Sequence, residues 1–296
     1  MEKSKQARTI KERAKKYIPL SLQSPIYKLV KKARFLKNIY SRKKISKDEF
    51  KKIFVQAGLK KGDIVLVHSS MGRIGYVENG PDDVIDALLE VIGKNGLLVM
   101  PGFCEPKYDR KLKMHVFDVQ NTPTYTGIIP ETFRKRRGIK RSISPTHSLC
   151  AFGKRAEEFV KNHENCDNPF AMNGPFGKLY HWNAKIMLIG VDHLANSSLH
   201  IVEDMLDFPV NVFTDKFKAL ILDNGKKKII EARRHTAYSR RIRDPNIMEK
   251  YCLQHEVMKI LKIGNTELRI IKIKPFVDMM KKLYKPVFST TTPCSA

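Results

Sequence analysis

The chain has 296 residues, of which 42% are hydrophobic and only 16 are Gly and 15 Pro. This composition excludes collagen-like, low-complexity and wholly disordered proteins. Its 56 Lys and Arg against 30 Asp and Glu give a net charge of +26, which points to anionic partners such as nucleic acid, acidic membranes or phosphorylated ligands. Five cysteines without CxxC spacing predict reduced thiols and a cytoplasmic protein. No apolar run approaches the roughly 18 residues that span a bilayer.

The charge excess is concentrated near the N-terminus. Residues 1–44 hold 15 Lys and Arg against two Glu. Pro19 and Pro25 break this segment into two short amphipathic helices, each with a basic and an apolar face. Such helices can lie in an anionic membrane interface, here at the inner face of the membrane. The alternative is an arm that packs its apolar side on its own protein or on a second subunit, which leaves a homodimer open. We therefore expect a basic arm over residues 1–45.

A folded domain is expected over residues 46–286, followed by a tail over 287–296. Ser46 and Glu49 have capping-box spacing, which predicts a helix that runs to about Ala57. Three continuous apolar runs predict buried parallel strands, over 63–68, 96–101 and 185–190. A further strand is expected over 148–152, and helical spacing is found over 81–92, 127–137, 156–162 and 199–206.

Two regions of the domain look different from this core. Residues 104–127 are polar, aromatic and Pro-bearing, so we expect a long loop at the functional site. From about residue 210 the pattern predicts a C-terminal lobe, with short strands over 219–222 and 228–231, a helix over 245–261, and a strand-plus-helix unit over 266–284. The whole sequence predicts an α/β fold with a mostly parallel central sheet flanked by helices, and a basic helical N-terminal extension.

Ser69 and Ser70 follow the first predicted strand. Hydroxyls and turn amides at the carboxyl edge of a parallel sheet can cradle phosphate, although two serines are a weak signal. The sequence has no G-x-x-x-x-G-K-[ST], G-x-G-x-x-G or G-x-S-x-G motif. Nucleoside-triphosphate, dinucleotide and serine-hydrolase functions therefore lose their main support.

Histidines are the other candidates for chemistry. His200 and Glu203 lie three residues apart and share a face of a helix, so the carboxylate can hold the imidazole in one tautomer as a general base; a capping or structural pair has the same spacing. His147 and His163 are further candidates. We expect five other histidines to be structural or on the surface, namely His115, His181, His193, His235 and His255. No H-x-x-x-H or clustered Cys/His spacing occurs, so no metal site is expected.

Many short segments also occur in a characteristic order. They include Val67-His-Ser-Ser-Met-Gly-Arg-Ile-Gly75, Phe117-Asp118, Thr122-Pro-Thr124, Glu131-Thr-Phe-Arg134, Arg141-Ser142, Pro145-Thr-His-Ser148, His163 and Ser198-Leu-His-Ile-Val-Glu203. In this order they resemble the aminoglycoside 3-N-acetyltransferase family, from about Ser46 to Tyr284. The resemblance implies transfer of an acetyl group from acetyl-CoA to an amine of an amino sugar, on a fold distinct from the GCN5-type acetyltransferases.

Site roles follow from the resemblance. His163 matches the histidine after the helix that follows Pro145-Thr-His-Ser148, so it is the first candidate for the general base, and His147 is the second. Glu203 and His200 match the His-x-x-Glu element, with Glu203 as the orienting carboxylate or the group that binds a substrate ammonium. For the CoA phosphates and pantetheine we expect contacts from Ser69, Ser70, Arg141 and Ser142.

Two departures bear on the acceptor. Many members carry His-Pro at Ser144-Pro145 and Ser-Pro at Gly174-Pro175. These differences and the positive charge favour a phosphate-bearing amino sugar, such as a nucleotide-linked or lipid-linked intermediate of surface polysaccharide synthesis, over a polycationic antibiotic. The alternative is a catalytically degenerate member that binds an anionic membrane or nucleic acid. Nucleic acid is the weaker partner, since no recognised binding module is present and only 9% of residues are aromatic.

Overall fold

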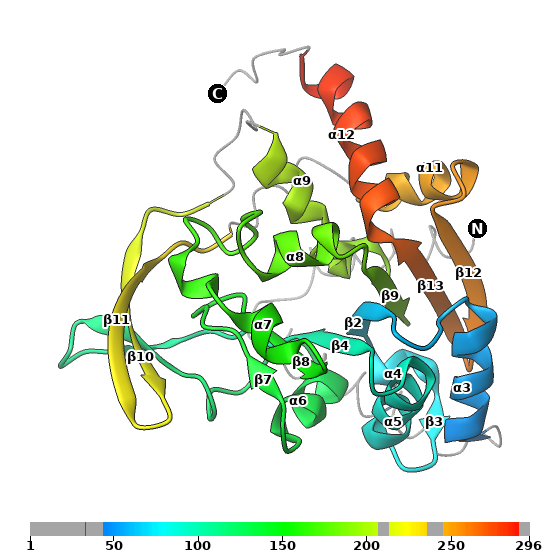
Figure 1. The fold of residues 1–296 in the computed structure, drawn as a ribbon, viewed down its shortest axis with the longest axis horizontal. Coiled ribbons are helices and arrows are strands. Elements are labelled where there is room, and N and C mark those ends of the chain that lie inside the picture. Colours follow the sequence, from blue (N-terminus) through cyan, green and yellow to red (C-terminus); the bar gives the residue numbers. More distant parts are fainter. Residues whose placement is uncertain (1–32, 34–43, 207–212, 236–244, 290–296) are drawn as a thin grey trace.

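A seven-stranded sheet forms the centre of the molecule, with helices on both faces (Figure 1). The computed structural model describes residue 33 and residues 44–206, 213–235 and 245–289; most of the predicted N-terminal arm and of the tail lies outside them. The strands run in the order β12-β13-β9-β2-β4-β8-β7. Their bounds are β2 Ile64–Ser69, β4 Leu97–Pro101, β7 Lys140–Arg141, β8 Leu149–Gly153, β9 Lys185–Ile189, β12 Met258–Ile263 and β13 Thr266–Lys272.

The central sheet is mixed, so the prediction of an α/β fold with helices on both sides is confirmed but that of a mostly parallel sheet is wrong. Strand β2 is parallel to both β4 and β9. The other four pairings are antiparallel. The apolar runs identify buried strands, but a strand buried on both faces has the same composition whichever way its neighbour runs.

The helices cover the two faces of this sheet. One face carries α3 Lys47–Gln56, α5 Pro81–Ile92 and α6 Ile128–Lys135. The other carries α7 Ala156–Val160, α8 Pro175–His181, α9 Leu199–Met205 and α12 Ile273–Ser289. The short helices are α4 Met71–Ile74 and α11 Met248–Gln254, with 3-10 turns at His163–Asn165, His193–Ala195 and Pro245–Ile247.

Strand β2 shows how the sequence produces these layers. Successive side chains of a strand point to opposite faces. Val65 and Val67 accordingly join the core under α3 and α5, whereas Leu66 joins the core under α8 and α9. All three are fully buried, which explains the uninterrupted apolar run. The capping box of α3 is also as predicted, because Ser46 Oγ accepts from the Glu49 backbone and the Glu49 carboxylate accepts from Ser46 N–H.

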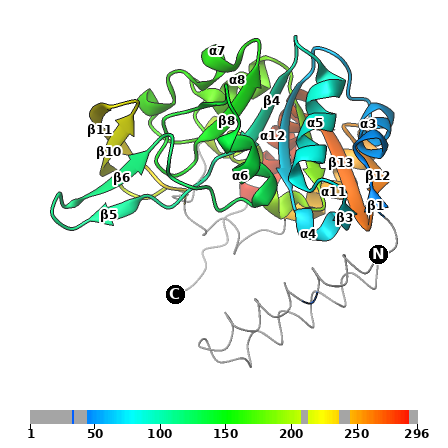
Figure 2. The same cartoon turned by 90° about the horizontal axis from the view of Figure 1, so that it is seen from below.

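A second, four-stranded sheet projects from one side of the molecule (Figure 2). Its order is β11-β10-β6-β5, with β5 Lys107–Asp109, β6 Met114–Asp118, β10 Phe217–Asp223 and β11 Lys226–Ala232. A two-stranded pair, β1 Lys44–Ile45 with β3 Tyr76–Val77, completes the sheets. The prediction of one long loop over 104–127 is therefore wrong, because a hairpin occupies part of it. Lys113 forms its turn with a φ of 51°.

The residues after 213 divide between the two sheets. Strands β10 and β11 belong to the small sheet, whereas β12, β13 and α12 join the central one. The helix predicted over 245–261 is too long. Helix α11 ends at Gln254, Glu256 follows with a φ of 54°, and β12 begins at Met258. A left-handed residue cannot continue a right-handed helix, so the chain turns there into the strand.

Candidate active site

A cavity of about 340 Å³ opens beyond the carboxyl ends of β2, β4 and β9. Open α/β sheets bind their ligands in this position. The residues that line it come from the strand ends, from the start of α9 and from loops, and they are His68, Ser69, Pro101, Phe103, Tyr125, Thr126, Pro130, His147, Phe170, Val191, Leu194, Ala195, Asn196, Ser197, His200 and His235.

Glu203 lies behind two of the histidines of this cavity. Its Oε2 atom is 2.7 Å from His200 Nδ1 and 2.9 Å from His235 Nε2. A carboxylate only accepts, so both nitrogens donate and carry hydrogen. Burial acts to raise the pKa of Glu203, but the two imidazoles outweigh it and hold this pKa well below its usual range. His200 thus keeps Nε2 as its acceptor nitrogen, and no hydrogen bond of the described chain uses that atom.

A second polar group of the cavity lies at the end of β2. His68 Nε2 is 3.2 Å from Ser197 Oγ. Burial, with a smaller contribution from the nearby His200, lowers the pKa of His68 to about 3, so this ring is neutral at pH 7. The next residue, Ser69, has a buried Oγ with no hydrogen-bond partner among the described residues. A buried hydroxyl without a partner is costly, and a bound ligand would satisfy it.

His147 also faces the cavity. Its Nδ1 atom is 2.8 Å from Thr146 Oγ1, and its ring packs edge-on against Phe103 and Phe170. Burial lowers the pKa of His147 well below its ordinary value. This histidine is therefore neutral, and none of the described carboxylates bonds to it as Glu203 bonds to His200.

His163 lies outside this cavity, fully engaged in hydrogen bonds. The Ser142 hydroxyl lies between the Leu149 N–H, which donates to Ser142 Oγ at 2.8 Å, and His163 Nδ1 at 2.7 Å. In the neutral ring the hydrogen is on Nε2, so Nδ1 accepts from the Ser142 hydroxyl. His163 Nε2 then donates to the Pro169 carbonyl at 2.9 Å. Burial lowers the pKa of His163 to about 4. With both ring nitrogens occupied, the geometry does not favour the base role expected for His163, nor the CoA contact expected for Ser142.

Arg141 is likewise turned inward. Its guanidinium donates to Ser148 Oγ at 2.9 Å and to the carbonyl oxygens of Gly102 and Thr122, each at 2.6 Å. It also lies over the Phe117 ring, 4.8 Å from the ring centre. Burial lowers the pKa of Arg141 below its ordinary value. These contacts leave little of the guanidinium for a CoA phosphate and make Arg141 a clamp on the loops around it.

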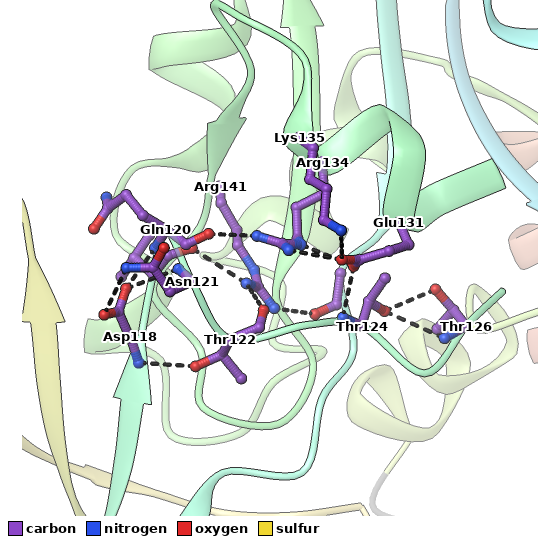
Figure 3. A network of polar contacts seen from close by, with 12 residues as sticks. Asp118, Gln120, Asn121, Thr122, Thr124, Thr126, Glu131, Arg134, Lys135 and Arg141 are labelled. Carbon is purple, nitrogen blue, oxygen red and sulfur yellow. Dashed lines mark hydrogen bonds and ion pairs between the residues drawn. The ribbon is translucent and has the colours of Figure 1, made fainter. Parts of the chain in front are cut away.

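Figure 3 shows the network to which Arg141 belongs. Glu131 accepts from Arg134 at 2.8 Å and from the Thr124 N–H at 3.0 Å. Thr124 and Thr126 donate in turn to the carbonyls of Phe103 and Pro101. The network thus holds the loop that contributes Tyr125 and Thr126 to the cavity wall. The motif residues that lie between Phe117 and Arg141 in the sequence therefore hold this loop in place.

The structure brings together His147, His200, Glu203 and Ser69 among the predicted residues, while Ser70 follows Ser69 as the N-cap of α4. Reasoning from sequence missed His68, Ser197 and the part played by His235. His68 stands at the end of a predicted parallel strand beside Ser69, which is a usable signal. His235 has no signal in the sequence, because it reaches Glu203 from 32 residues away.

His200, Glu203 and His235 also have the chemistry of metal ligands. One nitrogen each of His200 and His235 and an oxygen of Glu203 all lie within 4.8 Å of one another. Two imidazoles and a carboxylate are a common ligand set for zinc. The sequence did not predict this cluster because His235 is 32 residues from Glu203 in the chain.

The fold and the site define a class of protein. The cavity lies at the carboxyl ends of the parallel strands of a three-layer α/β fold, and a carboxylate-backed histidine faces it. This arrangement suits an enzyme that uses a general base. Residues 66–285 match the aminoglycoside 3-N-acetyltransferase family. The chain belongs to this family and is an acyltransferase, as the resemblance implies.

Two curated relatives show the extent of the similarity. The SPβ prophage-derived aminoglycoside N(3')-acetyltransferase-like protein YokD of Bacillus subtilis (strain 168) is 27% identical over 250 residues, which cover 77% of this chain and 88% of that protein. Aminoglycoside N(3)-acetyltransferase VII of Streptomyces paromomycinus is 30% identical over 184 residues, or 57% of this chain and 64% of that enzyme.

Solved structures support the fold. The crystal structure of aminoglycoside acetyltransferase AAC(3)-Xa superposes with a TM-score of 0.75 at 23% identity, covering 88% of this chain and 99% of that one. AAC-IIIb, solved as a binary complex with CoASH, gives a TM-score of 0.74 at 21% identity, covering 85% and 100%. YokD of Bacillus subtilis gives 0.71 at 26% identity, covering 83% and 95%. Within the described residues, no helix has the length and apolar character needed to cross a membrane.

Proposed function

We propose that this protein transfers the acetyl group of acetyl-CoA to an amine of an amino sugar, with His200 as the general base and Glu203 as its orienting carboxylate. The observation that carries the proposal is the Glu203–His200 hydrogen bond of 2.7 Å at the wall of the cavity. The co-substrate is supported by the structural neighbour AAC-IIIb with CoASH. The acceptor class is supported by the neighbour AAC-VIa with sisomicin.

The reaction follows from the protonation states of the site. His200 Nε2 accepts a proton from the acceptor ammonium, and the freed amine attacks the thioester carbonyl carbon. A C–N bond forms and the C–S bond breaks. The nitrogen loses its second proton to the departing CoA thiolate, which leaves as the thiol, and the imidazolium of His200 then releases its proton to solvent. The Glu203 carboxylate stabilises the imidazolium that forms on His200, because opposite charges lie one hydrogen bond apart in a buried setting.

The hydroxyl at the end of β2 is the group that we assign to acetyl-CoA binding. The buried Ser69 hydroxyl lacks a partner among the described residues, so it is the group that we assign to the thioester carbonyl or the pantetheine. Ser70 keeps its expected role near the cofactor, although its own N–H already donates to the Ile189 carbonyl. The second histidine of the wall, His147, is neutral and is assigned to positioning of the acceptor.

The described lining of the cavity bears on the acceptor. It contains four histidines, Ser, Thr, Asn, Tyr and apolar side chains, but none of its described members is Asp or Glu. A polycation is best held by an acidic cleft. We therefore favour an amino sugar with a single amine that carries phosphate, as a nucleotide-linked or lipid-linked intermediate of surface polysaccharide synthesis, over a polycationic aminoglycoside.

The location follows from the same chemistry. An acetyl-CoA-dependent reaction and four unpaired cysteines, Cys104, Cys150, Cys166 and Cys252, suit the cytoplasm. The arm over residues 1–44 carries +13 and is assigned to the anionic inner membrane surface. The alternative of a binding protein without activity is less well supported, because the paired His200 and Glu203 face a ligand-sized cavity.

The test is release of free thiol from acetyl-CoA in the presence of single amino sugars, phosphorylated and not, and of aminoglycosides. H200A should lower kcat by about 10²–10⁴-fold with acetyl-CoA binding kept, the usual contribution of a general base. E203Q should lower kcat in the same direction. H255A, which removes an exposed histidine outside the cavity, is the matched control. Absence of thiol release with every acceptor, together with a melting temperature that CoA does not raise, would leave the binding-protein alternative.

A further inference from the structure

His235 reaches the Glu203–His200 pair from a different part of the fold. It follows strand β11 and is held by a β-bridge to Phe213. Its ring is nearly buried, stands edge-on to Phe170 at 5.5 Å between ring centres, and lies 3.8 Å from the ring of His200. The backbone bridge and the aromatic contact together fix where the imidazole points.

Both histidines donate to the same oxygen of Glu203. The distances to Oε2 are 2.7 Å from His200 Nδ1 and 2.9 Å from His235 Nε2. A carboxylate held by a single donor can rotate about its last carbon–carbon bond and keep that bond. A second donor on another element restricts this rotation and keeps the oxygen within hydrogen-bond distance of His200 Nδ1.

We propose that His235 is a positioning residue for acetyl transfer: its Nε2–H fixes Glu203, and Glu203 in turn fixes the tautomer and direction of His200. This rests on the proposed function. Partners that orient a metal-ligating histidine change affinity or activity by about 10–100-fold when they are lost, and we expect a loss of similar size here. His235 touches no reacting atom in this role and acts through Glu203.

Other polar groups surround His235. His147 faces it, with 6.4 Å between ring centres. The neighbouring Arg234 is paired with Glu105 at 2.8 Å, and Asp204 accepts from Asn168 at 2.6 Å. Arg234 and Asp204 are therefore engaged with residues other than Glu203 in these two contacts.

Three substitutions separate the hydrogen bond from the shape of the ring. In H235Q the amide nitrogen stands near the place of Nε2 and keeps a donor, whereas in H235N the shorter amide falls short of Glu203. H235L fills the space without a donor. We expect kcat of H235L and H235N to fall about 10-fold or more with the KM for acetyl-CoA within about 2-fold, and H235Q to recover most of kcat. Each variant is compared at equal folded fraction by circular dichroism.

Several outcomes would overturn the proposal. Wild-type kcat in H235L would show that the second donor is unnecessary, and equal loss in H235Q and H235L would assign the effect to the ring and not to the bond. Stoichiometric zinc in the purified protein, with kcat lost on chelation and restored by zinc, would make the three residues metal ligands. If H200A and E203Q keep full kcat, the proposed base itself fails; if they lose it while H235L does not, only the role of His235 fails.

Discussion

A histidine acts as a base only if it keeps an acceptor nitrogen for its substrate. His163 donates from Nε2 to a carbonyl and accepts at Nδ1 from Ser142, so its hydrogen bonds are complete without any ligand. His200 uses only its Nδ1 atom in the hydrogen bond to Glu203. The chemical difference between the two residues is therefore one of partners, since both are histidines that match family positions.

The first prediction concerns the pH dependence of stability. The pKa of His163 is lowered by burial to about 4, below the ordinary value near 6.5. Between these values the unfolded chain binds a proton that the folded chain does not. This contribution to stability is therefore complete above pH 6.5 and is lost as pH falls through about 4. Urea denaturation from pH 7 to pH 5 should show a decline of the order of 1 kcal/mol from this group.

H163N is the matching variant. It should be less stable than the wild type at pH 7, show a shallower decline toward pH 5, and keep turnover within a few-fold when folded. A loss of 10²-fold or more in kcat, with unchanged stability, would instead restore the base role that the sequence suggested for His163.

Arg141 gives the second prediction. R141M should destabilise the protein by about 3 kcal/mol, because it removes a donor from Gly102 O, Thr122 O and Ser148 Oγ, which are buried or partly buried. Equilibrium urea unfolding measures this loss. In the folded fraction the KM for acetyl-CoA should stay within about 2-fold. A large increase in this KM at unchanged stability would mean that the guanidinium binds CoA after all.

At the scale of elements, local signals were sufficient for the helices and for the buried strands. The capping box at Ser46 and the apolar period of residues 81–92 are local, and both helices form where the sequence predicted them. The direction of β8 and β13 was not predictable, because it depends on which strands meet across the sheet. The hairpin at 107–118 was missed because most of its residues are at least partly exposed, so no apolar run marked it.

Within the site, too, the local contacts were visible in the sequence and the long-range contacts were not. The His200–Glu203 pair lies within one helical turn and was visible in the sequence. The additional bond from His235 joins the segment after β11 to α9, and the bond between Ser197 and His68 joins the segment before α9 to β2. Contacts over such separations leave no periodic trace. The inward direction of Arg141 was not visible for a related reason, since an arginine in a motif gives no sign of whether it faces a phosphate or backbone carbonyls.

Helix α3 carries the third prediction. It begins before the family match at residue 66, yet Phe50 and Phe54 are fully buried in the core beneath it. S46A should lower the free energy of unfolding by about 1 kcal/mol, the usual cost of losing an N-cap. E49Q, which can still reach the Ser46 N–H, should cost less. Equal stability of S46A and the wild type in urea would show that the core alone holds the helix.

At the scale of the whole molecule, the segment with the densest positive charge precedes most of the described fold. Residues 1–44 carry +13 and the remaining 252 residues carry the other +13. The described fold begins with β1 at Lys44, which pairs with Tyr76, so a cut after residue 43 preserves every element of the two larger sheets. Acetyl transfer and membrane binding should consequently be separable in one truncated protein.

The last prediction uses that truncation. The full chain should co-sediment with vesicles that contain phosphatidylserine and not with pure phosphatidylcholine, because clustered basic residues are attracted to an anionic surface at about 1 kcal/mol each. Binding should weaken as salt shortens the Debye length from about 10 Å at 0.1 M to about 3 Å at 1 M. Removal of residues 1–43 should abolish sedimentation and leave kcat for a soluble acceptor within a few-fold. If the truncated protein unfolds, or dissociates into subunits in analytical ultracentrifugation, the arm packs on protein and the membrane assignment is wrong.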